Sequence, residues 1–407
     1  MATPSLRSYQ SEAVNIMIKD REIPGNSVLV LGTAAGKSHI IANYVKEFGE
    51  PTLILCPNRE ILAQNRAKLK ALVSADDIGT YSASMKEKTI KLFTFATIGS
   101  IYRKASLFSH FSTVIVDECH TVRPDKYNSM YLNFFGGSKP VKIFGLTATP
   151  YINIQATSFF ARDDDGRPIY ETNIYLKIIT KLQQNFWDRI IFNYDAKKLC
   201  ENGYTVPVKY TEYHFISPNL YKLNSSKTEY DQDAYAKEMD VFSDRLASVC
   251  EACMEKYVST LVFCSNVAQA EKLQSLVAGS EVVSAKTPAK KRDEIIKRFV
   301  SGEIKLLFNV SCLTTGFDSP RTDCLVILRP TKSLGLYQQF IGRGVRLSPE
   351  TGKKSCKVID LSATYTRLGA AEDIRIVEKN GTTDIVSSKP SIKDGLRVST
   401  FRFKPNR

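Results

Sequence analysis

The sequence has few of the features that mark membrane-spanning, exported or disulfide-rich proteins. No apolar stretch approaches the roughly eighteen residues needed to cross a bilayer. The N-terminal segment has no apolar signal core, so we expect a protein that is not exported and stays in the cytoplasm. The nine cysteines form no disulfide framework. Cys250 and Cys253 have C-x-x-C spacing, but they lie on a helical pattern without a second pair, so we expect no metal there.

The composition is that of an ordinary globular chain with room for two or three domains. Of the 407 residues, 43% are hydrophobic and 24% are charged, which excludes a disordered or fibrous protein. The 56 basic residues outnumber the 42 acidic ones, so the net charge is +14. Such an excess suits a polyanionic partner. The sequence has no short-period repeat and no low-complexity tract.

A loop of small residues follows an apolar strand pattern and precedes a helical pattern at 39–47. The loop consists of Leu31, Gly32, Thr33, Ala34, Ala35, Gly36, Lys37 and Ser38. Loops of this kind wrap their backbone N–H groups around the phosphates of a nucleotide. Lys37 is then expected to reach the β and γ oxygens, and the Ser38 hydroxyl to contact Mg²⁺.

Two adjacent carboxylates, Asp117 and Glu118, end a second apolar strand pattern. In phosphoryl transfer, the two carboxylates of such a pair have different roles. Asp117 is expected to hold the metal, and Glu118 is expected to polarise the attacking water. The loop and the carboxylate pair, in this order and each at the carboxyl end of a strand, predict a hydrolase of nucleoside triphosphates.

Short apolar strands alternate with helical patterns in two parts of the chain, which predicts doubly wound parallel α/β sheets in both. The helical patterns include 60–72 and 290–299. The strand patterns are Ser27–Leu31, Thr52–Cys56, Lys91–Phe95, Thr113–Val116, Lys142–Leu146, Thr260–Cys264, Glu281–Ser284, Lys305–Val310, Cys324–Leu328 and Lys357–Leu361. We expect an N-terminal domain at 1–200, a second domain at 201–375, and an aperiodic basic tail at 376–407.

An aromatic-rich stretch at 151–242 separates the two alternating parts. It contains the acidic turn 163–166 and the single tryptophan of the chain, Trp187, beside Phe186. These aromatic residues fit two interpretations: a wedge that stacks on bases at a nucleic-acid junction, or the hydrophobic core of an inter-domain connector.

Eight motifs appear in order along nearly the whole chain. They are Arg7-Ser8-Tyr9-Gln10, the phosphate loop, Cys56-Pro57-Asn58-Arg59-Glu60, the segment from Thr94 to Thr97, Asp117-Glu118-Cys119-His120, Leu146-Thr147-Ala148-Thr149-Pro150, Val262-Phe263-Cys264 with Leu313 to Pro320, and Gln339 to Arg346. This series resembles the motif set of superfamily-two helicases and translocases. Within that superfamily, the run from Leu313 to Arg346 resembles the RadD-like group of bacterial DNA helicases, and phage branch-migration helicases of the UvsW kind share the same core. The resemblance implies a location in the cytoplasm of a bacterial cell or, if the protein is phage-encoded, in the host cytoplasm.

The resemblance implies two tandem RecA-like domains with ATP and Mg²⁺ in the cleft. It implies that Gln10 reads adenine and that Gly316 and Asp318 touch the ribose and the phosphate track. Arg343 and Arg346, three apart on a predicted helix and so on one face, would reach the γ-phosphate from the second domain as arginine fingers. Gln339, one turn earlier, would contact the γ-phosphate or the water. Thr147 and Thr149 would bond the loop from Asp117 to His120 and transmit the nucleotide state to the nucleic-acid side.

The loop departs from the family at Ala34, which stands where glycine is common. Because alanine does not easily take a positive φ, we expect the loop to adopt a geometry that alanine accepts.

The resemblance also implies that Arg59, Thr94 and Thr97 grip a nucleic-acid backbone. Such contacts carry no sequence information, so we expect sequence-independent binding. His120 makes a DECH box, which favours DNA. The predicted function is an ATP-dependent DNA helicase or branch-migrating translocase that acts on branched or partly single-stranded DNA, alongside recombination or replication proteins. Three alternatives stay open: an RNA helicase, the motor subunit of a restriction enzyme, and a nucleic-acid-stimulated ATPase that does not unwind.

Overall fold

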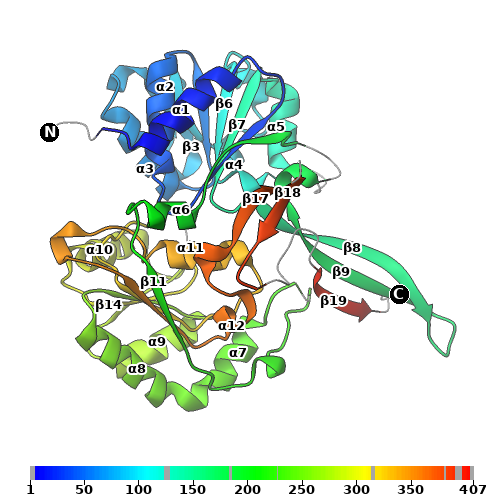
Figure 1. The fold of residues 1–407 in the computed structure, drawn as a ribbon, viewed down its shortest axis with the longest axis vertical. Helices are drawn as coiled ribbons and strands as arrows, with labels where there is room; N and C mark the ends of the chain where they lie inside the picture. Colours follow the sequence, from blue (N-terminus) through cyan, green and yellow to red (C-terminus); the bar gives the residue numbers. More distant parts are fainter. Residues whose placement is uncertain are drawn as a thin grey trace. The chain divides into compact units, whose positions relative to one another are not determined.

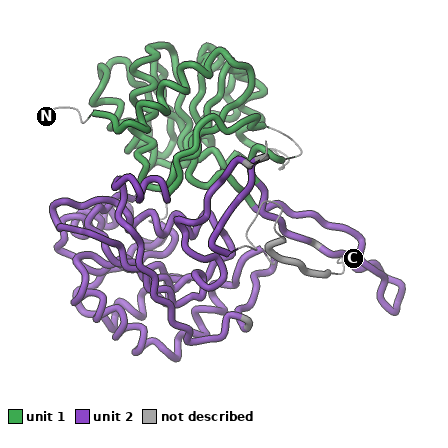
Figure 2. Tube along the Cα trace, viewed as in Figure 1, with its two compact units in different colours: residues 1–152, 178–196 green, residues 153–177, 197–407 purple. Residues whose placement is uncertain are grey.

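The structure is a computed structural model that describes residues 5–122, 129–182, 186–226, 228–312, 317–379, 382–389 and 397–403. The chain divides into two compact units (Figure 2). The first unit comprises Met1–Ile152 and Ile178–Ala196, and the second comprises Asn153–Lys177 and Lys197–Arg407. The expected first domain, 1–200, included residues 153–177, which group here with the second unit.

The first unit is built on an eight-stranded sheet in the order β10-β1-β7-β6-β2-β5-β3-β4 (Figure 1). Its strands are β1 (Ser27–Leu31), β2 (Thr52–Cys56), β3 (Ile78–Ser82), β4 (Glu87–Lys88), β5 (Phe93–Thr97), β6 (Thr113–Asp117), β7 (Lys142–Thr147) and β10 (Arg189–Tyr194). Neighbouring strands are parallel, and only the short β4 runs antiparallel to β3. β1, β2 and β6 are buried along their whole length, as expected of apolar strands covered on both faces.

The helices of this unit form two groups. α2 packs against both α1 and α3, and α4 packs against α5. Figure 1 shows the first group to the left of the strands and α5 to their right. The helices are α1 (Ser8–Asp20), α2 (Lys37–Phe48), α3 (Arg59–Lys70), α4 (Ile98–Ile101) and α5 (Met130–Ser138). β1, β7 and β6 are neighbours and parallel, so the loops that follow them meet at one edge of the sheet.

A buried charge network joins the opposite edge of this sheet. Lys142 begins β7 and is 1% exposed, and its Nζ lies 2.7 Å from Oδ2 of Asp20, at the end of α1. Arg189, which begins β10, places Nη2 2.8 Å from Asp20 Oδ1, and the Ser27 hydroxyl of β1 donates to Asp20 Oδ2 at 2.5 Å. Three neighbouring strands and α1 therefore share one carboxylate.

Trp187 belongs to the core of the first unit. Its side chain is fully buried, and it packs edge-on against Phe186 with 5.0 Å between ring centroids. A Cβ added to Gly145 of β7 would lie 2.6 Å from the Trp187 ring. The interpretation of Trp187 as a junction wedge is therefore wrong, because a fully buried ring packed against β7 cannot stack on a base.

The second unit has a six-stranded parallel sheet in the order β11-β16-β15-β12-β14-β13. The strands are β11 (Val208–Glu212), β12 (Thr260–Phe263), β13 (Glu281–Val283), β14 (Leu306–Asn309), β15 (Cys324–Ile327) and β16 (Cys356–Asp360). The helices are α6 (Ala196–Glu201), α7 (Gln232–Met239), α8 (Ser243–Lys256), α9 (Val267–Leu276), α10 (Ala289–Ser301), α11 (Leu334–Gly342) and α12 (Thr364–Leu368).

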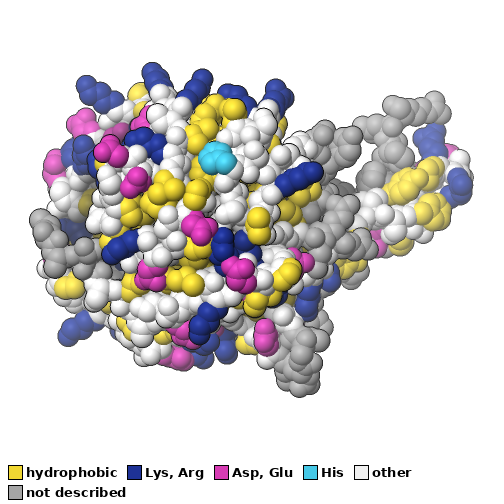
Figure 3. Space-filling model, turned by 90° about the horizontal axis from the view of Figure 1, so that it is seen from above, with side chains coloured by type: hydrophobic (Ala, Val, Ile, Leu, Met, Phe, Trp, Pro, Cys, Tyr) yellow, Lys and Arg dark blue, Asp and Glu magenta, His cyan; other side chains and the backbone are white. Residues whose placement is uncertain are grey.

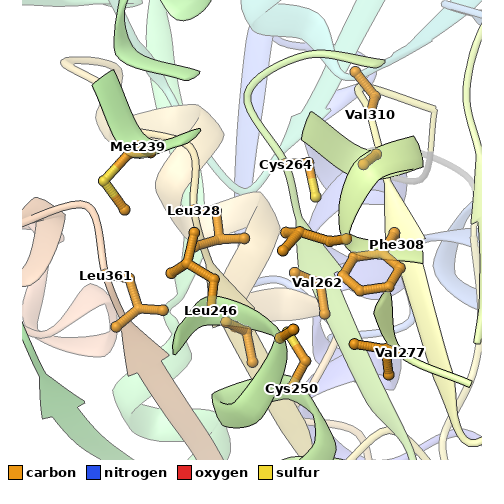
Figure 4. Packing of buried hydrophobic residues seen from close by; sticks show 14 of the residues in the cluster. Met239, Leu246, Cys250, Val262, Cys264, Val277, Phe308, Val310, Leu328 and Leu361 are labelled. Atoms are coloured by element: carbon orange, nitrogen blue, oxygen red, sulfur yellow. The ribbon is translucent and has the colours of Figure 1, made fainter. Parts of the chain in front are cut away.

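The core of the second unit lies between α8 and the central strands (Figure 4). Leu246 and Cys250 of α8 face Val262 and Phe308, and each of these four is at most 1% exposed. Cys253, the second cysteine of the C-x-x-C pair, is buried in the same cluster. Both sulfur atoms therefore take part in apolar packing.

The remaining strands lie outside the two parallel sheets. β8 (Tyr151–Arg162) and β9 (Pro168–Ile178) form a long hairpin (Figure 1), and the acidic turn 163–166 closes it. β19 (Arg397–Phe403) pairs antiparallel with β9, and β17 (Arg375–Lys379) pairs with β18 (Thr382–Val386). The segment from residue 376, expected to be a basic tail, contains β18, β19 and most of β17 among its described residues. Such short strands are defined by their partners, so sequence periodicity does not predict them. No helix in the described part of the chain is long and apolar enough to cross a membrane.

Candidate nucleotide site and arginine segment

The phosphate loop joins β1 to α2 through two left-handed residues. Gly36, the residue before α2, has φ 74° and ψ 40°. Ala34 has φ 69°, so the expectation that the loop would avoid a positive φ at alanine is wrong. A left-handed alanine costs roughly 1–2 kcal/mol, so neighbouring contacts must hold the loop in this shape.

Those contacts come from α1. The carbonyl oxygen of Ala35 accepts hydrogen bonds from the Tyr9 hydroxyl at 2.7 Å and from Nε2 of Gln10 at 3.0 Å. Tyr9 stacks on Tyr194 of β10 with 4.2 Å between ring centroids, and the backbone N–H of Gly32 donates to the Tyr194 carbonyl at 2.9 Å. The loop is thus held from both sides.

Both the oxygen and the nitrogen of the Gln10 side-chain amide form hydrogen bonds within this unit. Its Oε1 accepts from the backbone N–H of Arg7 at 3.0 Å, while Nε2 bonds the phosphate loop. A Cβ added to Gly36 would lie 2.7 Å from Nε2, so glycine is needed for this close approach. The structure places Gln10 against the loop, and its reading of adenine stays a prediction.

Asp117 ends β6 in a buried, hydrogen-bonded position. Asn65 of α3 donates to its Oδ2 at 2.8 Å, and the backbone N–H of Glu118 donates to its Oδ1 at 3.0 Å. Burial, together with the Glu118 charge, raises the pKa of Asp117 to about 6. Sequence reasoning missed Asn65. The available signal was a polar residue on the apolar face of a helix, in line with Ile61 and Leu69.

Glu118 contacts the side chains of both Lys37 and His120 through its carboxylate. Its backbone is left-handed (φ 53°, ψ 52°), which turns its side chain toward the phosphate loop. Lys37 Nζ lies 3.2 Å from Glu118 Oε1, and Nδ1 of His120 lies 3.4 Å from Oε2. The side chains of Lys37 and Glu118 are 15% and 16% exposed. Two predicted motifs, eighty residues apart, therefore meet in one ion pair.

His120 links the Glu118 loop to the segment after β7. Its Nδ1 lies 2.9 Å from the Thr147 hydroxyl and 3.2 Å from that of Thr149, and the Thr149 N–H donates to Thr147 Oγ1 at 3.0 Å. Burial lowers the pKa of His120, which favours the neutral imidazole. The predicted pairing of these threonines with the carboxylate loop is present in the structure.

The predicted backbone-gripping residues lie in different settings. Arg59 is exposed at the start of α3, which Asn58 caps by accepting from the backbone N–H of Ile61 at 2.9 Å. Thr97 ends β5 and bonds Ser100 at 2.9 Å. Thr94 is fully buried, and its hydroxyl donates to the Lys91 carbonyl at 2.8 Å. The hydroxyl of Thr94 is therefore used within this unit, and the nucleic-acid contact expected of the segment from Thr94 to Thr97 stays a prediction.

The arginine segment of the second unit differs from its prediction. α11 ends at Gly342, so Arg343 and Arg346 do not share a helix face. Arg343 follows the helix and donates to the Phe317 carbonyl, whereas Arg346 pairs with Thr205 in an isolated bridge. The reason lies in the fold: a Cβ added to Gly344 would lie 2.3 Å from the Cys356 sulfur, so the chain turns close to β16 at that point.

Asp318 forms an ion pair with Arg346, and its side chain is 44% exposed. Gln339 is half-buried on α11. Gly316 lies outside the described residues. Within the second unit, Asp318, a predicted nucleotide ligand, is thus ion-paired with Arg346, a predicted arginine finger.

Two helicase domain models match the chain. Residues 3–152 match the res subunit of type III restriction enzymes, and residues 244–348 match the conserved C-terminal domain of helicases. The phosphate loop and the Asp117–Glu118 pair lie in the first match, and Arg343 and Arg346 in the second. The chain therefore carries two RecA-like α/β domains, and parts of both match helicase domains.

Individual relatives agree with this class. The chain is 24% identical over 88% of its length to a Saccharomyces cerevisiae protein that carries the name ATP-dependent helicase IRC3, and it spans about half (52%) of that protein. It is 24% identical to the DNA 3'-5' translocase XPB2 of Sulfurisphaera tokodaii, covering 84% of this chain and 78% of the relative. The fold matches a fragment of an HsdR subunit of a type I restriction enzyme from Vibrio vulnificus YJ016 with TM-score 0.63 and 19% identity, over 90% of this chain and 66% of that one.

Proposed function

We propose that the chain is an ATP-dependent DNA helicase or branch-migrating translocase that remodels forks and Holliday junctions in recombination or repair. The observation that carries the proposal is the Lys37–Glu118 contact of 3.2 Å between the phosphate loop and the DECH box. We further propose that the motor acts in the cytoplasm and alongside recombination or replication proteins.

ATP would bind at the loop between β1 and α2. The backbone N–H groups from Gly32 to Gly36, with Thr33 between them, would surround the phosphates at the N-terminus of α2, where the helix dipole favours negative charge. Lys37 would contact the β and γ oxygens. Because α1 already holds the loop through the Ala35 carbonyl, little rearrangement is needed on binding.

The residues present fit a magnesium ion beside the phosphates. Ser38, in the first turn of α2, and Asp117 supply a hydroxyl and a carboxylate, the oxygen ligands that Mg²⁺ prefers. Each Asp117 oxygen accepts one hydrogen bond from the protein and keeps a second lone pair. When bound, the ion neutralises charge on the phosphates.

Glu118 would change partners during hydrolysis. In this structure, Lys37 neutralises the Glu118 carboxylate at 3.2 Å. When Lys37 turns to the phosphates, Glu118 is free to accept a proton from the attacking water. His120 stays hydrogen-bonded to Thr147 and Thr149, so a shift of Glu118 would pass to the segment that follows β7.

The second unit would complete the reaction. We propose that Arg343 and Arg346 stabilise charge on the γ-phosphate and that Gln339 orients the water. For this, Arg346 must exchange its ion pair with Asp318 for the phosphate. Asp318 and Gly316 would then contact ribose and the phosphate track.

DNA is favoured as the substrate by the DECH box, by the net charge of +14 and by the relative named as a DNA translocase. Arg59 and Thr97 would hold the backbone of the strand without reading its bases. The test is ATP hydrolysis by the full chain with single-stranded DNA, forks, four-way junctions and RNA of matched length. Branched DNA should stimulate most, and Glu118→Gln should remove the signal. Equal stimulation by RNA and DNA would favour an RNA helicase.

A restriction-enzyme motor is the second candidate, because the first domain matches the res subunit of type III restriction enzymes. Such a motor would copurify with a nuclease and a methylase. Isolation of the tagged chain from its native cell, followed by mass spectrometry of its partners, decides between the two.

A further inference from the structure

Asn65 is a polar residue on an otherwise apolar face of α3. The buried residues of this helix are Ile61, Leu62, Asn65 and Leu69, and each is at most 7% exposed. The helix packs against α2 and against β2, β3 and β5 of the sheet. Ile61, Asn65 and Leu69 are spaced four residues apart, so they form one stripe along the helix. Packing alone would favour an apolar residue in the middle of that stripe.

The amide nitrogen of Asn65 reaches the ends of two strands. Nδ2 lies 2.8 Å from Oδ2 of Asp117, at the end of β6, and 3.6 Å from the sulfur of Cys56, at the end of β2. β2 and β6 are parallel neighbours in the sheet. Because an ionised carboxylate only accepts hydrogen bonds, the nitrogen and not the oxygen of the amide has to face Asp117. The carboxylate therefore determines the orientation of the Asn65 side chain.

The amide oxygen of Asn65 gains nothing from this position. Oδ1 is buried, and no group in the described part of the chain donates a hydrogen bond to it. A buried acceptor in this state costs free energy of folding. The hydrogen bond to Asp117 is thus the one property of this residue that an apolar side chain could not supply.

Asp117 depends on donors from the protein because it is removed from solvent. On the face shown in Figure 3, Lys and Arg side chains lie among Asp and Glu at the surface, where water reaches them. Asp117, in contrast, is 3% exposed. Its Oδ1 accepts from the adjacent backbone N–H of Glu118 at 3.0 Å, and its Oδ2 accepts from Asn65. One hydrogen bond on each oxygen fixes the rotation of the carboxylate, and Asn65 supplies the bond that comes from a distant segment.

We propose that Asn65 is a positioning residue of the nucleotide site, which holds the Asp117 carboxylate in the orientation that magnesium requires. This inference rests on the proposed function, in which Asp117 is a ligand of the ion. Without the Asn65 donor, the carboxylate can turn about its single bonds and has to be ordered when the metal binds. The affinity for nucleotide with Mg²⁺ should therefore fall, whereas the affinity for nucleotide without Mg²⁺ should not change.

The experiment measures binding of a fluorescent, non-hydrolysable ATP analogue to the full chain, in excess EDTA and during a titration with Mg²⁺. Asn65→Leu keeps the branched shape of the side chain and removes the donor. Its Mg²⁺ concentration for half-saturation should rise by about 10–100-fold, the usual effect of losing a group that holds a metal ligand. Its affinity in EDTA should equal that of the wild type, which also shows that the phosphate loop is intact.

Leu69→Ala is the matched control, because Leu69 is fully buried on the same face of α3 and its side chain offers no donor. It should lower the thermal stability and leave the Mg²⁺ requirement unchanged. Asn65→Ala, which introduces no larger group, replaces Asn65→Leu if the latter fails to fold. Asp117→Asn provides the background for a double-mutant cycle. If Asn65 acts through Asp117, then Asn65→Leu should cause no further loss of affinity in that background.

Three results would overturn this inference alone. They are an unchanged Mg²⁺ requirement in the Asn65 variants, an equal loss of affinity in EDTA and in Mg²⁺, and a further loss in the Asp117→Asn background. Each would show that Asn65 supports the fold and does not position the carboxylate. A wild-type chain whose nucleotide affinity does not respond to Mg²⁺ would defeat the proposed function instead.

Discussion

Lys37 and Glu118 form an ion pair with Nζ 3.2 Å from Oε1, although one residue begins α2 and the other follows β6. The contact is possible because Glu118 takes a left-handed backbone conformation. Each residue neutralises the other in a site where both are mostly buried. A nucleotide phosphate would compete for the same lysine, which ties the state of Glu118 to the presence of ATP.

Lys37→Ala should abolish ATP hydrolysis. The change removes the charge on the β and γ oxygens, and losing such a contact costs on the order of a hundredfold or more in rate. Steady-state hydrolysis in the presence of stimulating DNA is the measurement. Turnover near that of the wild type would contradict the whole assignment of this site.

Glu118→Gln should still bind ATP but hydrolyse it poorly. The amide keeps the shape and the contact with Lys37, and it loses the basicity needed to accept a proton. Nucleotide affinity and turnover are measured on the same preparation. If affinity fell as far as turnover, Glu118 would be a binding residue and not the base.

Arg343→Ala and Arg346→Ala should leave ATP affinity within a few-fold and slow hydrolysis by about a thousandfold or more, the range of arginine fingers. Arg298→Ala is the control, because Arg298 is a surface residue paired with Glu281 and Glu303. Wild-type turnover in both finger variants would exclude them from the reaction.

Asp20→Asn should destabilise the first unit by about 3–5 kcal/mol, because it leaves the buried Lys142 without its counter-charge. Unfolding by urea is followed through Trp187, the single tryptophan and a core residue of this unit. Asp76→Asn, at an exposed position, should have little effect. Equal midpoints for the two variants would show that the network adds no stability.

The same network predicts a pH dependence. Burial opposes ionisation of Asp20, but hydrogen bonds from Lys142, Ser27 and Arg189 outweigh it and hold the pKa below its ordinary value. The stabilisation is therefore present above the unfolded pKa and is lost as the pH falls through the folded one. The difference in free energy of unfolding between the wild type and Asp20→Asn should become smaller in acid. If this difference in free energy of unfolding became larger in acid, the lowered pKa of Asp20 in the folded protein would be contradicted.

Trp187→Ala should lower the stability of the first unit by about 3–5 kcal/mol, the usual effect of truncating a buried aromatic ring. DNA-stimulated hydrolysis and unwinding should fall together, because the ring packs against β7 beneath the site. Circular dichroism on heating gives the stability. Selective loss of fork unwinding at unchanged stability would restore the wedge interpretation.

The sequence by itself determined the two parallel sheets and the main candidate residues of the nucleotide site. Apolar strands followed by a small-residue loop or by two carboxylates are local patterns, and in a parallel sheet the carboxyl ends of neighbouring strands meet at one edge. Lys37, Asp117 and Glu118 could therefore be predicted together without coordinates. The resemblance also led correctly to the pairing of Thr147 and Thr149 with the DECH loop.

Only the tertiary structure decided which residues support these groups. Asn65 and Tyr9 reach the site from helices distant in sequence, and Ala34 is held left-handed by bonds from α1 that no local pattern encodes. The chain after α11 passes so close to β16 at Gly344 that a side chain there would meet Cys356, a contact between segments that no local pattern predicts. Local pattern determines strands and loops, whereas contacts between distant segments determine how each functional side chain is held.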